Sequence, residues 1–187
     1  MMPLATSAET VTMLRSRRGS SSFFDHTSPK RMSSFFSASG VTAGIAKTLA
    51  DAAGADLYEI RPAAPYTNAD LNWSDKNSRS SREAADPKSR PALADTDANI
   101  AAYDMIFIGV PIWWYVAPHI VNSFLESYDF SGKTIVVFAT SGGSGFGNTM
   151  AELKPSCADN VKWVRGDILS RRQTKEQLVE WVNSLKF

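Results

Sequence analysis

The sequence predicts an α/β protein built on a doubly wound parallel sheet with helices on both of its faces. Residues 105–110 and 134–139 form two apolar runs that are rich in β-branched and aromatic side chains. Unbroken apolarity, in place of strict alternation, indicates strands that are covered on both faces, as they are in parallel sheets. Strand-like and helix-like segments also alternate along the chain, which is the order of a doubly wound fold.

The first strand of this pattern ends at the apolar pair Phe35 and Phe36. The residues before it, 29–34, are short and polar, and serines contribute little apolar area even when they are buried. This weak first strand raises the question of how stable the fold is and how well it holds a ligand. A helix is predicted over residues 43–53, and Gly54 is suited to the position that ends it.

Residues 56–60 alternate as a second strand, with Leu57 or Tyr58 directed inward and Ile60 inward as well. The chain then turns polar from residue 62 to residue 99, which predicts a surface excursion over one edge of the sheet. Within it, Ser80 and Glu83 have the spacing of a capping box that would open a short helix.

The second half of the chain supplies the remaining elements. A crossover helix is expected to begin near Pro118, and residues 161–164 are predicted to form the last strand. Residues 173–185 carry apolar side chains on one helical face and predict the closing helix. The apolar stripe of the crossover helix consists of Ile120, Phe124, Leu125 and Tyr128.

Length and composition limit the classes of function. The 187 residues are 43% hydrophobic and carry a net charge of +1, which suits one domain and argues against a nucleic-acid surface. No apolar run is long enough to span a bilayer. A single cysteine, Cys157, fits a reducing cytosol and is expected to be unreactive. We expect an irregular extension over residues 1–31 and one folded domain over residues 32–187.

A hydroxyl-rich turn joins the first strand to the first helix. The first N–H groups of a helix lack internal partners and the helix dipole favours negative charge there, so this turn suits a phosphate group. The hydroxyls of Ser37, Ser39 and Thr42 add possible donors, and Gly40, just before Val41, allows close backbone approach. The alternative is a helix that is simply capped by a serine or threonine.

Two further turns follow the two buried strands, at the edge where ligands bind in open parallel sheets. One turn is aromatic and the other is rich in glycine, which suits a flat conjugated ring and a polar ring edge. The alternative is that Trp113 and Trp114 pack under the long excursion and that the glycines only form a turn. The residues of the two turns are Pro111, Ile112, Trp113, Trp114 and Tyr115, then Thr140, Ser141, Gly142, Gly143 and Gly145.

These motifs resemble those of the flavodoxin family, from about residue 35 to the C-terminus. The turn at 37–42 looks like its phosphate loop, and the turns at 111–115 and 140–143 look like its two ring-binding loops. The sequences Pro-Ile-Trp-Trp and Thr-Ser-Gly-Gly-Ser-Gly are similar to a group of bacterial flavodoxin-like proteins. The spacing is also similar to that of NAD(P)H quinone oxidoreductases. The resemblance implies a strand order of 2-1-3-4-5.

The resemblance also implies that FMN is the cofactor. The hydroxyls of the first turn would hold its phosphate, the aromatic turn would border its ring, and residues 141–145 would reach the pyrimidine edge. The implied cofactor-binding residues are Ser37, Ser39, Gly40, Val41, Thr42, Pro111, Ile112, Trp113, Trp114, Tyr115, Thr140, Ser141, Gly142, Gly143 and Gly145.

Three functions follow from this resemblance. The first is an FMN-dependent oxidoreductase that passes hydride or electrons from NAD(P)H to a quinone or similar small acceptor in the cytoplasm. The analogy with quinone reductases of this fold also suggests a homodimer. The second is an electron carrier that serves a partner reductase, although such carriers are usually strongly acidic. The third is a flavin-free binding module. His119 is a weak candidate for donating a proton to the acceptor, because a lone histidine near a helix start is more often an ordinary surface residue.

Overall fold

Five parallel strands form the sheet in the computed structural model, which describes residues 28–187. Their spatial order is β2-β1-β3-β4-β5, which confirms the order that the sequence resemblance implied. Each neighbouring pair is parallel. The two apolar runs lie in β3 and β4, next to one another in the sheet. The strands are β1 (Arg31–Phe35), β2 (Asp56–Glu59), β3 (Met105–Pro111), β4 (Thr134–Thr140) and β5 (Lys162–Ile168).

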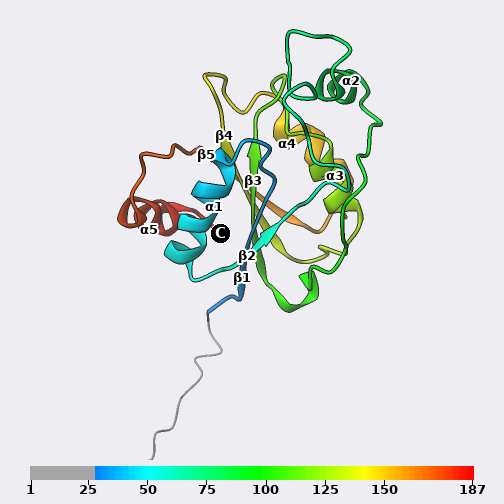
Figure 1. The fold of residues 1–187 in the computed structure, drawn as a ribbon. Helices are drawn as coiled ribbons and strands as arrows, with labels where there is room; N and C mark the ends of the chain where they lie inside the picture. The colour runs from blue at the N-terminus through cyan, green and yellow to red at the C-terminus, as the bar shows by residue number, and fades with distance from the viewer. Residues whose placement is uncertain (1–27) are drawn as a thin grey trace, which may run out of the picture.

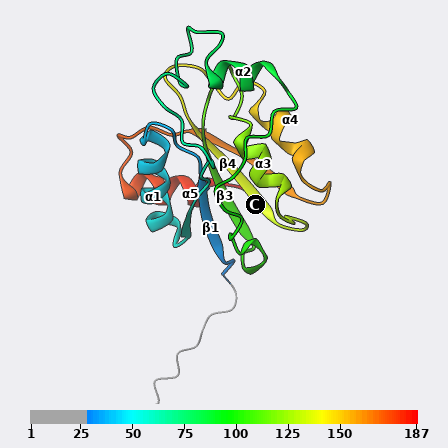
Figure 2. The ribbon, with the colours of Figure 1, turned by 45° about the vertical axis from the view of Figure 1, so that its right-hand side comes forward.

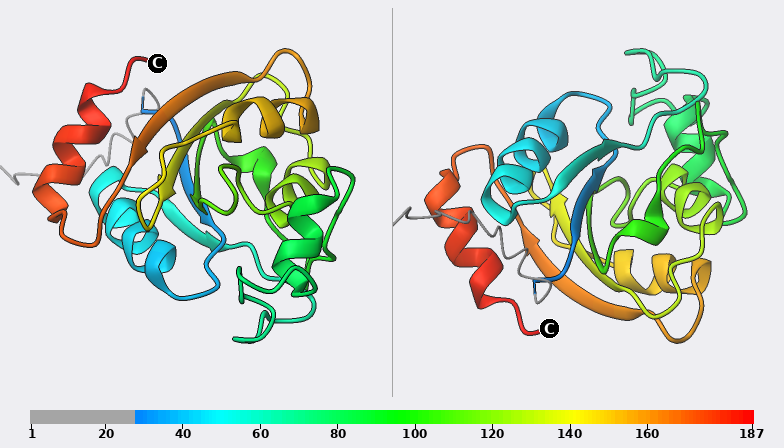
Figure 3. Two further views of the ribbon diagram at one scale, coloured as in Figure 1. Left: turned by 90° about the horizontal axis from the view of Figure 1, so that it is seen from above. Right: turned by 90° about the horizontal axis from the view of Figure 1, so that it is seen from below.

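Helices cover both faces of this sheet, as predicted. α1 and α5 lie on one face, and α3 and α4 lie on the other (Figures 1 and 3). α2 stands beyond the carboxyl ends of the strands (Figure 2). The helices are α1 (Val41–Ala53), α2 (Arg79–Ala85), α3 (Ile120–Glu126), α4 (Thr149–Leu153) and α5 (Lys175–Ser184), with short 3-10 turns η1 (Ile100–Ala102) and η2 (Lys154–Ser156).

The core is divided in two by the sheet. Successive side chains of a strand point to opposite faces, so Phe107 packs with α1 and α5 while Ile106 and Ile108 pack with α3. All three are fully buried. Burial of one such side chain stabilises the fold by about 1.5–3 kcal/mol. The unbroken apolarity of β3 is therefore explained by two separate cores that both draw on the same strand.

β1 is more regular than its polar sequence suggested. It begins at Arg31, next to the predicted boundary between extension and domain, and residues 1–27 of the predicted extension lie outside the described part of the chain. Ser33 and Ser34 are both fully buried. The Ser33 hydroxyl donates to the carbonyl of Ala46 in α1 at 3.2 Å. The small side chain of Ser33 thus lets α1 approach the sheet closely.

Both ends of α1 are set by glycines in the left-handed region. Gly54 ends the helix with φ 59°, and this confirms the role predicted for it. Gly40 precedes the first turn with φ 80°, and among the described residues no side chain caps the helix there. The simple alternative of a helix capped by serine or threonine is therefore wrong. β2 shows the expected alternation, because Ile60 beyond its end is buried, whereas Leu57 is 46% exposed.

The capping box predicted at Ser80 is wrong. α2 begins two residues earlier, and the hydroxyl of Ser78 accepts from the Ser81 backbone N–H at 3.3 Å. Ser80 is buried and instead donates to the carbonyl of Asp70 at 2.6 Å. Ser78 is equally suited to capping, and a tertiary contact engages the hydroxyl of Ser80, so the spacing from Ser80 to Glu83 was misleading.

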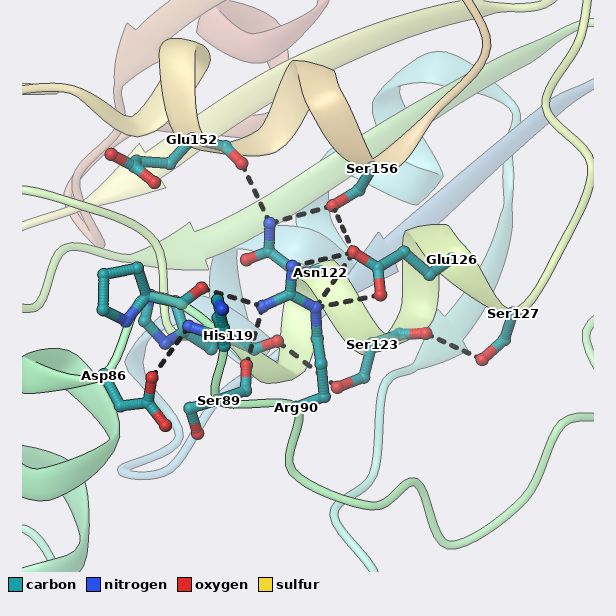
Figure 4. Close-up of polar contacts among 12 residues, drawn as sticks. Asp86, Ser89, Arg90, His119, Asn122, Ser123, Glu126, Ser127, Glu152 and Ser156 are labelled. Atoms are coloured by element: carbon teal, nitrogen blue, oxygen red, sulfur yellow. Dashed lines mark hydrogen bonds and ion pairs between the residues drawn. The ribbon is translucent and has the colours of Figure 1, made fainter.

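The segment over residues 62–99 is fastened to the α3 face of the molecule. Arg90 donates from Nε to both carboxylate oxygens of Glu126 at 2.9 Å, and Ser156 donates to the same carboxylate at 3.0 Å (Figure 4). The Arg90 guanidinium keeps the pKa of Glu126 below its usual range. Asn122, in α3, donates to the Glu152 carbonyl at 2.9 Å. These bonds join the segment, α3 and α4 into one layer.

The last elements complete the α1 face. β5 extends to Ile168 and is longer than predicted, and α5 opens with a capping box between Thr174 and Gln177. The Trp181 indole donates to Asp167 at 2.8 Å, which ties α5 to β5. α4 was not predicted. In the part of the chain that the structure describes, no helix has the length and apolarity needed to cross a membrane.

Candidate functional site

The turn after β1 leaves the start of α1 open. The Phe36 N–H donates to the carbonyl of Gly109 at 3.0 Å, and the chain then leaves the sheet. The first helical bond of α1 runs from the Gly44 N–H to the Gly40 carbonyl at 3.2 Å. The N–H groups of residues 41–43 therefore have no acceptor within the helix. Within residues 28–187, the buried Ser37 hydroxyl also has no partner. This turn thus presents several free donors.

Two threonines join this turn to the end of β4. The hydroxyls of Thr42 and Thr140 lie 2.9 Å apart, although the residues are 98 positions apart in the sequence. Both side chains are buried, and Thr42 is only 1% exposed. A hydroxyl can donate once and accept twice, so this contact leaves capacity for a ligand. The first and third of the predicted turns are therefore in direct contact.

The aromatic turn after β3 is a tight hairpin. The backbone groups of Trp113 and Val116 bond to each other in both directions, at 2.9 and 3.0 Å. The two residues between them, Trp114 and Tyr115, have positive φ values of 47° and 64°. Two-residue hairpins of this kind normally carry asparagine or glycine, and bulky residues are strained there. Such strain gathers at functional sites.

The three aromatics of this turn face different surroundings. Trp113 packs edge-on against Phe36 and Tyr66, with ring centroids 5.6 and 5.4 Å apart. Trp114 and Tyr115 are 42% and 67% exposed. Large aromatic side chains left in water cost hydrophobic free energy that a flat ligand would recover. The Trp113 ring is therefore held rigidly by its neighbours, whereas the rings of Trp114 and Tyr115 are open to solvent.

The glycine-rich turn after β4 is locked against the aromatic turn. The Asn148 N–H donates to the carbonyl of Tyr115 at 2.9 Å. Gly147 has φ 50°, and a side chain there would collide with the backbone of Tyr115. Nearer β4, Ser141 accepts from the Gly143 N–H at 3.1 Å and contacts the hydroxyl of Ser144 at 2.9 Å. The N–H of Gly143 is therefore used within the turn.

A cavity of about 500 Å³ opens where these turns meet. Its walls come from the start of α1, the ends of β3 and β4, and the loop that follows β5. The residues that line it are Ala38, Ser39, Val41, Thr42, Pro111, Ile112, Trp113, Thr140, Ser141, Gly142, Ile168, Leu169, Ser170, Arg171 and Arg172.

A second cavity, of about 430 Å³, adjoins the first and shares four of its residues. Its remaining walls come from the excursion over residues 62–99, which contributes Leu71, Trp73 and Ser80, and from Trp114. Trp73 is 79% exposed. None of the described residues that line this second cavity is charged. The first cavity, which has charged and polar residues in its walls, thus adjoins an uncharged second cavity that is lined by aromatic side chains.

Comparison with known proteins identifies the family. The family model named Flavodoxin matches residues 30–185, which is most of the chain. The chain belongs to the flavodoxin family. No curated protein matches the sequence. The family assignment agrees with the strand order and with the position of the site at the carboxyl ends of the strands, where flavodoxin-like folds bind ligands.

Solved structures support the same flavodoxin fold. A candidate flavoprotein from Bacteroides eggerthii is 47% identical, with a TM-score of 0.78, and the match covers 83% of this chain and 97% of that one. A candidate flavoprotein from Bacteroides uniformis is 46% identical, with a TM-score of 0.78 and coverage of 83% and 98%. A flavoprotein from Lactobacillus acidophilus, solved in complex with FMN, is 18% identical, with a TM-score of 0.60 and coverage of 83% and 99%, which shows the shared fold.

Most of the predicted site residues lie together in this flavodoxin-family chain. Ser37 lies instead on a neighbouring cavity of about 420 Å³ beyond the end of β2. Those on the first cavity are Ser39, Val41, Thr42, Pro111, Ile112, Trp113, Thr140, Ser141 and Gly142, and Trp114 lies on the second. Gly40, Tyr115, Gly143 and Gly145 line neither of the two cavities.

His119 lies apart from both of the larger cavities. It precedes α3 and is 6% exposed, so the alternative of an ordinary surface histidine is wrong. It lines a crevice of about 10 Å³ behind Trp113, and its Nδ1 atom is buried without a partner among the described residues. Figure 4 shows it at the start of α3. We assign it no role toward a ligand.

Cys157 also lies outside the site. Burial raises the pKa of its thiol to about 11, and the negative charge of Glu126 contributes in the same direction. At neutral pH the thiol is therefore almost entirely protonated, whereas the thiolate is the reactive form. This agrees with the unreactive cysteine that the sequence predicts.

Two parts of the site were not predicted from the sequence. The loop over residues 169–172 follows β5 and carries Arg171 and Arg172 on the wall of the first cavity. A signal was present, because a pair of arginines lies shortly after the carboxyl end of β5, but the strand was predicted to end at residue 164. The second missed part is Leu71 and Trp73, which belong to the excursion that was expected only to cover the surface.

Proposed function

We propose that this protein binds FMN non-covalently and acts as an oxidoreductase, passing hydride or electrons from NAD(P)H to a quinone or similar small acceptor. The observation that carries the proposal is the meeting of the free start of α1, the strained aromatic turn and the glycine-rich turn at one cavity. The Lactobacillus acidophilus flavoprotein, which shares the fold, was solved with FMN. Bound FMN would supply the redox chemistry, since its ring can take up hydride or electrons and pass them on.

The phosphate end of FMN suits the turn after β1. The free N–H groups of residues 41–43 and the hydroxyls of Ser39 and Thr42 are donors, and within residues 28–187 no side chain caps the helix. Gly40, with φ 80°, lets the backbone curl toward the ligand. A dinucleotide cofactor would instead call for Gly-x-Gly-x-x-Gly after the first strand, and that pattern is missing at residues 36–42.

The ring of FMN suits the cavity between the aromatic and glycine-rich turns. Ile112 and Trp113 supply an apolar wall, and the backbone at Ser141 and Gly142 supplies polar groups for the pyrimidine edge. Gly143 is excluded from this role because its N–H already donates to Ser141. Fixed donors near that edge would favour the negative charge that develops on a reduced flavin.

The second cavity favours an enzyme over a carrier. It adjoins the first and is walled by Leu71, Trp73 and Trp114, which suits a flat, uncharged acceptor such as a quinone. A carrier needs a docking surface instead, and carriers of this family are usually strongly acidic, whereas this chain has a net charge of +1. The electron carrier is the second candidate function, and a flavin-free binding module is the third.

We propose that the protein works in the cytoplasm. One cysteine in the chain and an unreactive thiol suit the reducing cytoplasm, where NAD(P)H is available. A homodimer is proposed by analogy with quinone reductases of this fold, and the molar mass in solution tests it.

Steady-state oxidation of NADH and NADPH by the FMN-loaded protein tests the proposed activity. With a panel of acceptors, we expect turnover with a quinone in the absence of any other protein. If the flavin is reduced only when a partner reductase is added, the protein is a carrier and the enzyme proposal is wrong. If the protein fails to bind FMN at all, both flavin-dependent functions are wrong.

Replacing Thr42 with Ala tests the phosphate site. The change removes a hydrogen bond to a charged group, worth about 1.5–3 kcal/mol, so affinity for FMN should fall roughly tenfold to a hundredfold. Affinity for riboflavin, which lacks the phosphate, should barely change. Quenching of flavin fluorescence measures both.

The matched control is Thr42→Ser, which keeps the hydroxyl and should bind FMN almost as the wild type does. Thr42→Ala also leaves the buried Thr140 hydroxyl without its partner, which should cost about 1–3 kcal/mol of stability. Thermal unfolding of the flavin-free protein measures this cost separately. Equal weakening of riboflavin and FMN by Thr42→Ala would show that Thr42 only supports the fold.

A further inference from the structure

The loop after β5 forms a wall of the first cavity and brings two arginines to it. Arg171 and Arg172 line the same cavity as Val41 and Thr42 at the start of α1. None of the described residues that line this cavity is an aspartate or a glutamate. The cavity therefore gathers two positive charges and the positive end of a helix dipole, with no acidic side chain to neutralise them.

The backbone of this loop is held in place while the guanidinium groups remain available. The Leu169 N–H donates to the carbonyl of Ala139 at 2.8 Å, which fastens the loop to the end of β4. Ser170 N–H donates to the Gln173 side chain at 2.8 Å, and its hydroxyl accepts from the Arg172 N–H at 3.1 Å. Over residues 28–187, neither arginine takes part in an ion pair.

The nearest acidic residue in the sequence does not offset these charges. Asp167 accepts from the indole of Trp181 on the α5 side of β5, and it is not among the cavity residues. A solvent-exposed arginine needs no partner, but two on one cavity wall beside uncapped helix N–H groups form a distribution that suits a doubly charged anion. The uncharged second cavity shows that the charge is confined to one end of the site.

We infer that Arg171 and Arg172 form a second wall of the phosphate site and bind the phosphate monoester of the flavin from the side opposite α1. This inference rests on the proposed function for the identity of the ligand. The hydroxyls and amides of the first turn give the phosphate its orientation, and the arginines balance its two negative charges. Affinity for FMN, in contrast to affinity for riboflavin, then depends on salt concentration.

The test compares the wild type with the double variant Arg171→Gln/Arg172→Gln by flavin fluorescence at low and high salt. We expect the double variant to bind FMN about tenfold more weakly at low salt, with riboflavin unchanged. The loss should shrink at high salt, where the charges are screened. The matched control, Lys175→Gln/Lys186→Gln, removes two exposed positive charges that do not line the cavity, and it should bind both flavins as the wild type does.

Three results would overturn the inference while leaving the proposed function intact. They are an unchanged ratio of FMN to riboflavin affinity in the double variant, an equal loss in the lysine control, and a change confined to the ratio of NADPH to NADH use. A wild type that binds neither flavin would refute the proposed function instead. Inorganic phosphate then tests the arginines alone: thermal stabilisation of the wild type but not of the double variant supports the anion site, and equal responses refute it.

Discussion

Replacing Gly109 with Ala is expected to destabilise the protein by about 3 kcal/mol, toward the upper end of the cost of overpacking a core. Gly109 pairs with Phe138 across the two central strands, β3 and β4. A Cβ atom at this position would meet the ring of Phe138, with the Cε2 atom only 2.8 Å away and Cζ closer still. Phe138 is fully buried, so its ring has no free space to move into. Chemical denaturation measures the loss.

The double variant Gly109→Ala/Phe138→Leu separates this clash from other effects of the alanine. Leucine lacks the ring that meets the new methyl group, so the double variant should be more stable than the sum of its single losses predicts. The double variant should therefore lose less stability than the sum of the single losses by about 1 kcal/mol or more, as expected for side chains in direct contact. Additive losses, or a Gly109→Ala protein as stable as the wild type, would contradict the packing described for β3 and β4.

The parts of the fold that the sequence predicts are those in which local and tertiary signals agree. β3 and β4 are apolar because both of their faces are covered, and this pattern is visible without any knowledge of the neighbours. The three turns could be placed at one edge because parallel strands end on the same side of a sheet. Most of the proposed site was therefore within reach of the sequence, and the comparisons confirm the family.

The parts that were missed depend on contacts between distant segments. β1 has a polar sequence although it is buried, because Ser33 lies against α1 and its hydroxyl finds an acceptor there, 13 residues away in the sequence. Ser80 and Ser78 are equally good helix caps locally, and only the carbonyl of Asp70 decides between them. The contribution of Arg171 depends on where β5 ends, and strand ends are poorly determined by local sequence.

The conformation of the aromatic turn was also beyond prediction. Positive φ at Trp114 and Tyr115 is unfavourable for both residues, so it must be imposed by the surroundings. The structure shows how this happens: the Trp113 ring is wedged against Phe36, and the carbonyl of Tyr115 is held by the Asn148 N–H. The glycine-rich turn is thus a support for the aromatic turn as well as a wall of the cavity.

Replacing Gly147 with Ala is therefore expected to damage both the fold and the site. A Cβ atom there would lie 2.7 Å from Cβ of Tyr115 and closer still to its carbonyl oxygen. The backbone cannot rotate away as a side chain can, and φ 50° is itself unfavourable for alanine. We expect a loss of about 2–4 kcal/mol in stability, from strain and overpacking together. Because the aromatic turn is displaced, affinity for FMN and for riboflavin should both fall at least roughly tenfold.

Gly44→Ala is the matched control, because Gly44 lies in α1 at an exposed position where nothing would meet the added methyl group. Alanine favours the helix by roughly 0.5–1 kcal/mol relative to glycine, so this variant should be more stable than the wild type. Replacing glycine with alanine is thus expected to raise the stability at Gly44 and to lower it at Gly147. An equal loss of affinity for both flavins in Gly147→Ala places the defect in ring binding, whereas Thr42→Ala should lower the affinity for FMN alone. If Gly147→Ala binds both flavins normally, the aromatic turn does not border the ring.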